Sequence, residues 1–195
     1  MKGTRRQKAE GRRQGRSFAA YCLLLTAFCL LVSSCGYTAT RILPAYYRTI
    51  YVEPFQNKIP ITEDVTEKIG FVTNYPEIEE KVTRGAINQF LFDGNLRVTN
   101  KPENADLTLT GAVIDFYRQP IRRKENDTVE EYRLNLSASV TLRDKAGKLL
   151  LQNSAMVGDT TYFLTGPSTR SEGAAVEDLV TDFSHRVVEW VIEYW

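Results

Sequence analysis

The residue in the most distinctive chemical setting is Cys35, which closes the run Val32-Ser33-Ser34-Cys35. A head with seven Lys and Arg residues and an apolar segment over 18–32 precede it. A basic head, a short apolar segment and a small-residue exit are the parts of a secretory signal. The segment is shorter than the roughly 20 residues that a membrane-spanning helix needs. The sequence therefore predicts that residues 1–34 are a cleaved signal peptide.

The cysteine at this exit has its own explanation. The order Val-Ser-Ser-Cys resembles the lipobox of bacterial lipoproteins, and the resemblance implies cleavage before Cys35 and attachment of acyl and diacylglycerol chains to it. Two or more chains would hold the protein on a bilayer, because each buried methylene contributes about 0.8 kcal/mol. The alternative is an ordinary signal peptide followed by a chance cysteine. No cofactor is expected besides this covalent lipid.

A second set of candidate residues consists of basic side chains in the segment 118–131, which we expect to form a charged hairpin tip. Its cations are Arg118, Arg122, Arg123 and Lys124. Arginine forks make bidentate, charge-assisted bonds to phosphate. Charge runs more often simply face water. From the residues alone, both interpretations stay open.

The composition after residue 34 limits the function classes. Of 25 basic and 24 acidic residues, seven and one lie in 1–34, which leaves 18 basic and 23 acidic residues and a formal charge of −5. An acidic domain argues against nonspecific nucleic-acid binding. Cys22 and Cys29 would leave with the signal peptide and Cys35 would carry lipid, so no thiol remains for a disulfide or a metal site.

Enzymatic motifs are missing from the sequence. The single histidine, His185, lies between apolar positions of a predicted helix and is best explained as a surface or packing residue. There is no Gly-x-Ser-x-Gly, His-Glu-x-x-His or phosphate-binding glycine motif. We therefore expect a protein that is not an enzyme and binds no metal. A hydrolase using scattered carboxylates is the least favoured alternative.

The hydrophobic pattern predicts an α+β fold. Period-two alternation predicts strands over 48–55, 96–99, 106–117, 132–143 and 148–162. Apolar stripes at three-to-four spacing predict helices from Pro76 to Asp93-Gly94 and over 171–195. Both helices should cover one face of a mostly antiparallel four- to five-stranded sheet, as a two-layer sandwich. The expected organisation is a lipidated tether at 35–47 and one domain at 48–195.

The order of several short motifs resembles the lipopolysaccharide-assembly lipoproteins, the LptE family. The matching stretches are Cys35-Gly36-Tyr37, Ile50-x-Val52-x-x-Phe55-x-Asn57, Asp93-Gly94, Ala105-Asp106-Leu107-x-Leu109-x-Gly111, Glu131-Tyr132-x-Leu134, and Val140-x-Leu142-x-Asp144-x-x-Gly147-Lys148. The closing helix also fits, whereas the loop over 58–75 is longer than in the family pattern.

This resemblance implies an outer-membrane lipoprotein on the periplasmic side that plugs and helps assemble the LptD β-barrel and contacts lipopolysaccharide. The implied contact residues are Arg122, Arg123 and Lys124, which precede the Glu131-Tyr132 pair, with Lys145 and Lys148 on the neighbouring turn as a weaker choice. The alternative is another envelope accessory lipoprotein, such as a secretin pilotin or an activator of cell-wall synthesis.

Overall fold

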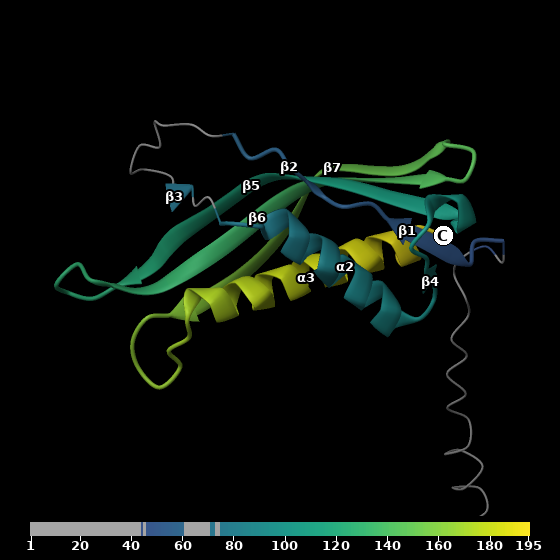
Figure 1. The fold of residues 1–195 in the computed structure, drawn as a ribbon. Helices are drawn as coiled ribbons and strands as arrows, with labels where there is room; N and C mark the ends of the chain where they lie inside the picture. Colours follow the sequence, from purple (N-terminus) through teal and green to yellow (C-terminus); the bar gives the residue numbers. More distant parts are fainter. Residues whose placement is uncertain (1–43, 45, 61–70, 73–74) are drawn as a thin grey trace, which may run out of the picture. The chain divides into compact units, whose positions relative to one another are not determined.

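The computed structural model describes residues 44, 46–60, 71–72 and 75–195. The predicted signal peptide, Cys35 and most of the loop predicted over 58–74 lie outside the described residues. Within the described part, two helices, α2 (Ile78–Asp93) and α3 (Glu172–Glu193), cover one face of a mixed sheet (Figure 1). The predicted two-layer α+β arrangement is confirmed.

Three long strands form the body of the sheet. They are β5 (Leu107–Arg123), β6 (Val129–Asp144) and β7 (Leu149–Phe163), and they pair antiparallel in that order. Within the described residues, β7 is an edge strand, because only β6 and the single bridge between Phe163 and Thr169 pair with it.

Short strands complete the other side of β5. β1 (Thr49–Val52) and β2 (Gln56–Asn57) run parallel to β5, β3 (Phe71–Val72) runs antiparallel to it, and β4 (Arg97–Val98) runs parallel to β1. The expectation of a mostly antiparallel sheet of four to five strands is thus matched only roughly. The parallel pairing follows from α2, which returns the chain to the starting end of β1 before β5 begins.

The strand β5 is longer than predicted. The sequence pattern ended it at Tyr117, but pairing continues to Arg123, and only residues 124–128 link it to β6. Pro120 lies within this extension. Beyond Arg118 no described strand lies on the other side of β5, so a missing N–H at Pro120 removes no ladder bond there.

The core lies between the helices and the apolar face of β6. The predicted alternation of β6 is confirmed, with five fully buried side chains at Leu134, Leu136, Ala138, Val140 and Leu142. The stripe of α2 is narrower than predicted: Ile78, Val82, Ala86 and Phe90 are buried, whereas Leu91 is 60% exposed. Leu91 lies about 100° around the helix from Phe90, which turns it away from the sheet.

Of the two ends of α2, only the C-terminal one lies where the sequence predicted it. Gly94 closes α2 with φ 73°, as the Asp93-Gly94 pair predicted. At the other end, Pro76 is not the first helical residue, because Glu77 has a φ of 60° and the helix begins at Ile78. Ser171 caps α3, where its side chain accepts a hydrogen bond from the Ala174 N–H at 3.2 Å.

Two glycines allow aromatic residues to lie directly on the sheet. A Cβ at Gly111 of β5 would come within 2.1 Å of the Phe55 ring, so only glycine allows the ring to lie this close to the strand. A Cβ at Gly158 of β7 would lie 2.7 Å from Cβ and 3.0 Å from Cα of Phe183 on α3. The Phe55 and Phe183 rings meet edge to face, with centroids 6.3 Å apart. These four residues join β5, the segment after β1, α3 and β7.

The contact at Gly158 predicts the effect of substitution. Gly158→Ala should lower the free energy of unfolding by about 2 kcal/mol, because the backbone of α3 must move outward. Gly173→Ala is the matched control, since a Cβ at Gly173 meets nothing within 4 Å and should leave stability unchanged or slightly raised. Denaturant unfolding followed by circular dichroism measures both. Equal midpoints for the two variants would contradict this packing.

Candidate functional site

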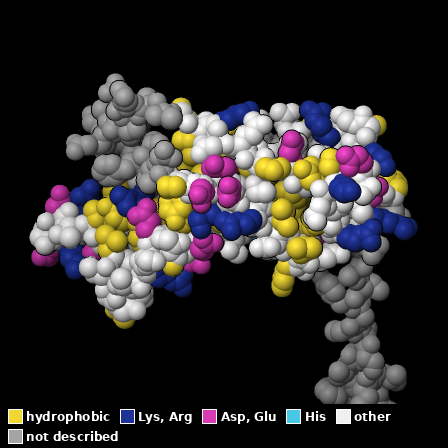
Figure 2. Space-filling view, viewed as in Figure 1, with side chains coloured by type: hydrophobic (Ala, Val, Ile, Leu, Met, Phe, Trp, Pro, Cys, Tyr) yellow, Lys and Arg dark blue, Asp and Glu magenta, His cyan; other side chains and the backbone are white. Residues whose placement is uncertain are grey.

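The predicted phosphate-contact residues lie at the end of the β5–β6 hairpin, and each has an acidic neighbour. Arg122 Nε lies 3.5 Å from a Glu131 oxygen, Arg123 Nη1 lies 3.2 Å from Asp127, and Lys124 Nζ lies 3.4 Å from Glu130. Figure 2 shows basic and acidic side chains intermingled at this tip. The hairpin tip is therefore a set of ion pairs and not an uncompensated basic patch.

These acidic partners were not predicted from the sequence. The segment 118–131 holds four basic residues and four acidic ones, Glu125, Asp127, Glu130 and Glu131. The antiparallel register sets Arg122 opposite Glu131 and Arg123 opposite Val129. The predicted end of the strand at Tyr117 hid this pairing, because it left Arg122 and Arg123 outside any strand pair.

The ion pairs at the tip differ in burial. Glu131 has a side chain only 11% exposed, so Arg122 compensates a carboxylate that is largely removed from water. Asp127 is 85% exposed and Arg123 is 50% exposed, so their attraction is weak and screened. An incoming phosphate could replace Asp127 on Arg123 at little cost, but it could replace Glu131 on Arg122 only by leaving a buried carboxylate unpaired.

Arg118 belongs to the core and not to the tip. Its Nη1 lies 2.6 Å from Glu172 in the first turn of α3, and its guanidinium lies 4.7 Å from the centroid of the Tyr132 ring. Tyr162, stacked on Tyr132, donates its hydroxyl to Glu172 at 3.3 Å. Burial alone would lower the pKa of Arg118, but the Tyr162 hydroxyl and the Glu172 charge raise it overall. This cluster fixes the start of α3 on the sheet.

The structure separates the two sets of basic residues that the family resemblance suggested. Lys145 and Lys148 lie in the turn between β6 and β7, whereas Arg122, Arg123 and Lys124 lie where β5 leads into β6 (Figure 1). The 16 residues of β6 lie between them, a length of about 50 Å. The description of the β6–β7 turn as neighbouring was wrong, because the two turns are at opposite ends of the same strand.

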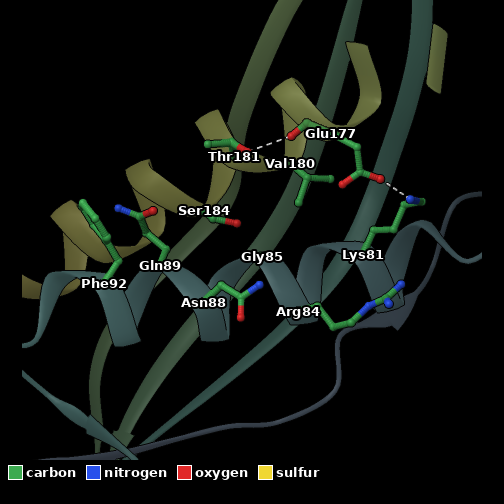
Figure 3. A pocket seen from close by; sticks show the side chains of 10 residues that line it. All are labelled: Lys81, Arg84, Gly85, Asn88, Gln89, Phe92, Glu177, Val180, Thr181 and Ser184. Carbon is green, nitrogen blue, oxygen red and sulfur yellow. Dashed lines mark hydrogen bonds and ion pairs between the residues drawn. The ribbon is translucent and has the colours of Figure 1, made fainter. Parts of the chain in front are cut away.

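A groove of about 520 Å³ lies between the outer surfaces of α2 and α3 (Figure 3). Its floor is made where Gly85 meets Val180 and Ser184; a Cβ at Gly85 would lie 2.6 Å from the Ser184 hydroxyl. Ion-paired Lys81 and Glu177 lie along the groove. Its other lining side chains are mostly polar: Arg84, Asn88, Gln89, Phe92 and Thr181. The groove offers hydrogen-bonding groups and one exposed aromatic ring.

This groove lacks the arrangement that catalysis would need. The Ser184 hydroxyl is buried and forms no hydrogen bond to any described residue, so no described base activates it. His185 lies on the surface, 56% exposed, with Nδ1 3.3 Å from Glu189, which confirms its expected role as a surface or packing residue. The described residues contain no group of three or more His, Cys, Asp or Glu that could hold a metal.

Neither helix in the described part of the chain is long and apolar enough to cross a bilayer. Cys35, the predicted lipidation site, lies outside the described residues. The first described residues, Pro44 and Tyr46–Tyr47, are the last part of the tether predicted over 35–47.

Comparison with solved structures finds chains with a similar fold. The solution NMR structure of an uncharacterized lipoprotein B from Nitrosomonas europaea aligns with a TM-score of 0.52 at 12% identity, over 82% of this chain and 90% of that one. The rare lipoprotein B from Shewanella oneidensis aligns with a TM-score of 0.44 at 11% identity, over 73% and 94%. The first likeness establishes a shared two-helix α+β fold. No curated protein matches the chain by sequence.

The family is defined by the sequence itself. The model of the lipopolysaccharide-assembly family LptE matches residues 47–189, which is more than half of the chain and nearly all of the described domain. The chain belongs to the LptE family. The resemblance seen in its motifs is confirmed.

The burial of the ion pairs predicts which cations are structural. A double-mutant cycle between Arg118 and Glu172 should give a coupling energy of about 1–2 kcal/mol, because both side chains are less than a third exposed. The control cycle between Arg123 and Asp127 should give about 0.5 kcal/mol or less. Urea unfolding of the single and double alanine variants measures both. Similar coupling energies in the two cycles would contradict the conclusion that the Arg118 pair is structural and the Arg123 pair is not.

Proposed function

We propose that this protein is an outer-membrane lipoprotein, anchored through Cys35 on the periplasmic side, that plugs and helps assemble an LptD-type β-barrel and assists lipopolysaccharide insertion. Membership of the lipopolysaccharide-assembly family across residues 47–189 carries the proposal. The family consists of non-enzymatic accessory lipoproteins, so we propose no catalytic role for this chain.

A contact with a protein partner is supported by the end of α2. Phe92 is 87% exposed and Leu91 is 60% exposed, although both are large apolar side chains in adjacent positions. Figure 2 shows hydrophobic side chains protruding near this end of the helix. Exposed apolar side chains beside a polar groove are typical of protein interaction sites. We assign them to the contact with the barrel.

The hairpin tip is proposed as the lipopolysaccharide contact. Arg123 and Lys124 are half exposed and paired with Asp127 and Glu130, so phosphate groups can exchange with these carboxylates. Arg122 is held by Glu131 and orients the end of β5. Lys145 and Lys148, about 50 Å away along β6, do not share this proposed site.

The partner is tested by purifying the full-length lipidated protein from outer membranes and identifying what accompanies it by mass spectrometry. The expected partner is the lipopolysaccharide-translocating β-barrel. Phe92→Ser should reduce its recovery several-fold, since an exposed apolar contact is lost. Leu164→Ser is the matched control, because Leu164 is an exposed apolar residue outside α2.

Other outcomes of this purification contradict the proposal. Recovery of a secretin or of a cell-wall synthase in place of the barrel would support the alternative of a different envelope accessory lipoprotein. Normal surface lipopolysaccharide after depletion of the protein would contradict the assembly role even if a barrel is recovered.

The proposed lipopolysaccharide contact at the hairpin tip is tested with a variant in which Arg122, Arg123 and Lys124 are all replaced by Ala. This triple variant should retain the barrel but bind lipopolysaccharide about ten-fold more weakly, because charge-assisted bonds to phosphate are lost. The control removes three other exposed cations, Lys58, Arg97 and Lys101. Photo-crosslinking to lipopolysaccharide and permeability to large antibiotics are the measurements. If the triple variant assembles and behaves like the control, the tip does not contact the phosphates.

A further inference from the structure

Four aromatic rings meet at the end of the sheet opposite the hairpin tip. The centroids of Tyr46 and Tyr47 are 4.4 Å apart, those of Tyr47 and Trp195 are 5.1 Å apart, and those of Tyr194 and Trp195 are 5.4 Å apart. Tyr46 and Tyr194 are 68% and 58% exposed, while Tyr47 and Trp195 pack partly against the core. We call these four residues the aromatic end.

The aromatic end is held rigidly. The Trp195 indole donates a hydrogen bond to the Val191 carbonyl at 3.1 Å, one turn earlier in the chain, and the Tyr47 N–H donates to the Pro44 carbonyl at 3.0 Å. The contact between the Tyr47 and Trp195 rings brings the residues that enter the domain against the last residues of the described chain. Half of this ordered aromatic surface nevertheless remains in solvent, which its packing role does not explain.

The turn between β6 and β7 lies at the same end. Asp144 at the end of β6 pairs with Leu107, and Leu107 pairs with Ile50 of β1 (Figure 1). Burial, then the neighbouring Tyr46 and then the charge of Asp144 raise the pKa of Tyr47, which agrees with a turn close to the rings. This turn carries two exposed lysines, Lys145 and Lys148.

Charges of both signs lie at this end, and its lysines are exposed. Neither lysine forms an ion pair with a described residue. Asp144 Oδ1 accepts the N–H groups of Ala146 and Lys148, both at 2.9 Å. Asp106 accepts the N–H groups of Arg48 and Thr49, at 2.9 and 3.0 Å. These two carboxylates are thus engaged by the backbone.

The exposed acids near this end are fewer than the cations. Glu193 lies on the last turn of α3 and Glu103 lies in the short helix η1 (Pro102–Asn104). Lys145, Lys148 and Lys101 are exposed at the same end. Exposed Tyr rings among lysines match a surface that is part apolar and part anionic, which is the chemistry of a phospholipid headgroup region.

We propose that the aromatic end lies in the headgroup region of a phospholipid bilayer and forms a second, protein-based membrane contact beside the lipid on Cys35. Tyr and Trp have an apolar body and a polar edge, which suits them to this depth. Cys35 lies eleven residues before Tyr46, so even a fully extended tether keeps the rings within about 40 Å of the anchor. The inference rests on the lipidation in the proposed function.

This contact fixes the orientation of the domain relative to the bilayer. A lipid anchor alone leaves the orientation free, whereas two contacts fix the end at β1 against the bilayer. The hairpin tip is then held about 50 Å from that surface, along the axis of β6. The lysines of the β6–β7 turn contact anionic headgroups in this arrangement and the arginines of the tip do not.

The two tryptophans of the chain provide the test. Trp190→Phe leaves Trp195 of the aromatic end as the only indole, and Trp195→Phe leaves Trp190, which packs partly against the core, as the matched control. Each lipidated full-length variant is reconstituted into phosphatidylethanolamine–phosphatidylglycerol vesicles whose acyl chains are brominated close to the headgroup. Trp195 emission should fall at least two-fold relative to unbrominated vesicles, with little change for Trp190.

A further variant and two parallel measurements make the outcome decisive. Lys145 and Lys148→Glu should reduce the quenching of Trp195 by half or more, with an unchanged circular dichroism spectrum. Mass spectrometry of the same sample reports the lipid on Cys35, and barrel recovery is scored separately. A lipidated protein with unquenched Trp195 overturns this inference and leaves the barrel assignment intact. Quenching only when the barrel is present also overturns it, in favour of a protein contact.

Discussion

The whole domain depends on one line of close packing through its centre. Gly111 of β5 receives the Phe55 ring, Phe55 meets Phe183 edge to face, and Phe183 lies on Gly158 of β7. Because neither glycine has a side chain, the chain after β1 and the middle of α3 approach the backbone of the sheet directly. This approach sets the depth at which both helices lie, and with it the position of Glu172 against Arg118 and of the last turn of α3 against Tyr47.

Sequence patterns predicted the features that depend on a single segment, such as the type of each element. They did not predict the features that depend on a second segment, such as strand direction and contacts between elements. The alternation from Tyr132 to Arg143 and the stripes of both helices predicted the layers. Alternation carries no information on strand direction, so the parallel pairing of β1 with β5 could not be read from it. Gly158 contacts Phe183, which lies 25 positions later and on another element. Linear distance hid that contact.

At the candidate site, too, the basic residues were predicted from the sequence and their acidic partners were not. Arg122, Arg123 and Lys124 lie at the predicted hairpin tip, whereas Arg118 lies within β5 beside α3. Register brings Glu131 to Arg122, the turn brings Asp127 to Arg123, and α3 brings Glu172 to Arg118. One run of basic residues therefore contains a partly buried anchor, an exposed arginine paired with a nearly buried carboxylate, and an exchangeable surface pair. The aromatic end escaped prediction because its rings come from both ends of the described domain.

Within the part of the chain that the structure describes, the outer edge of β7 has a consequence for self-association. Its fifteen residues carry a single charged side chain, Asp159, and no proline. A long strand edge of this kind accepts another strand readily, so two copies that meet can join sheet to sheet. An isolated pool of the domain is therefore prone to aggregation, and more so as its concentration rises.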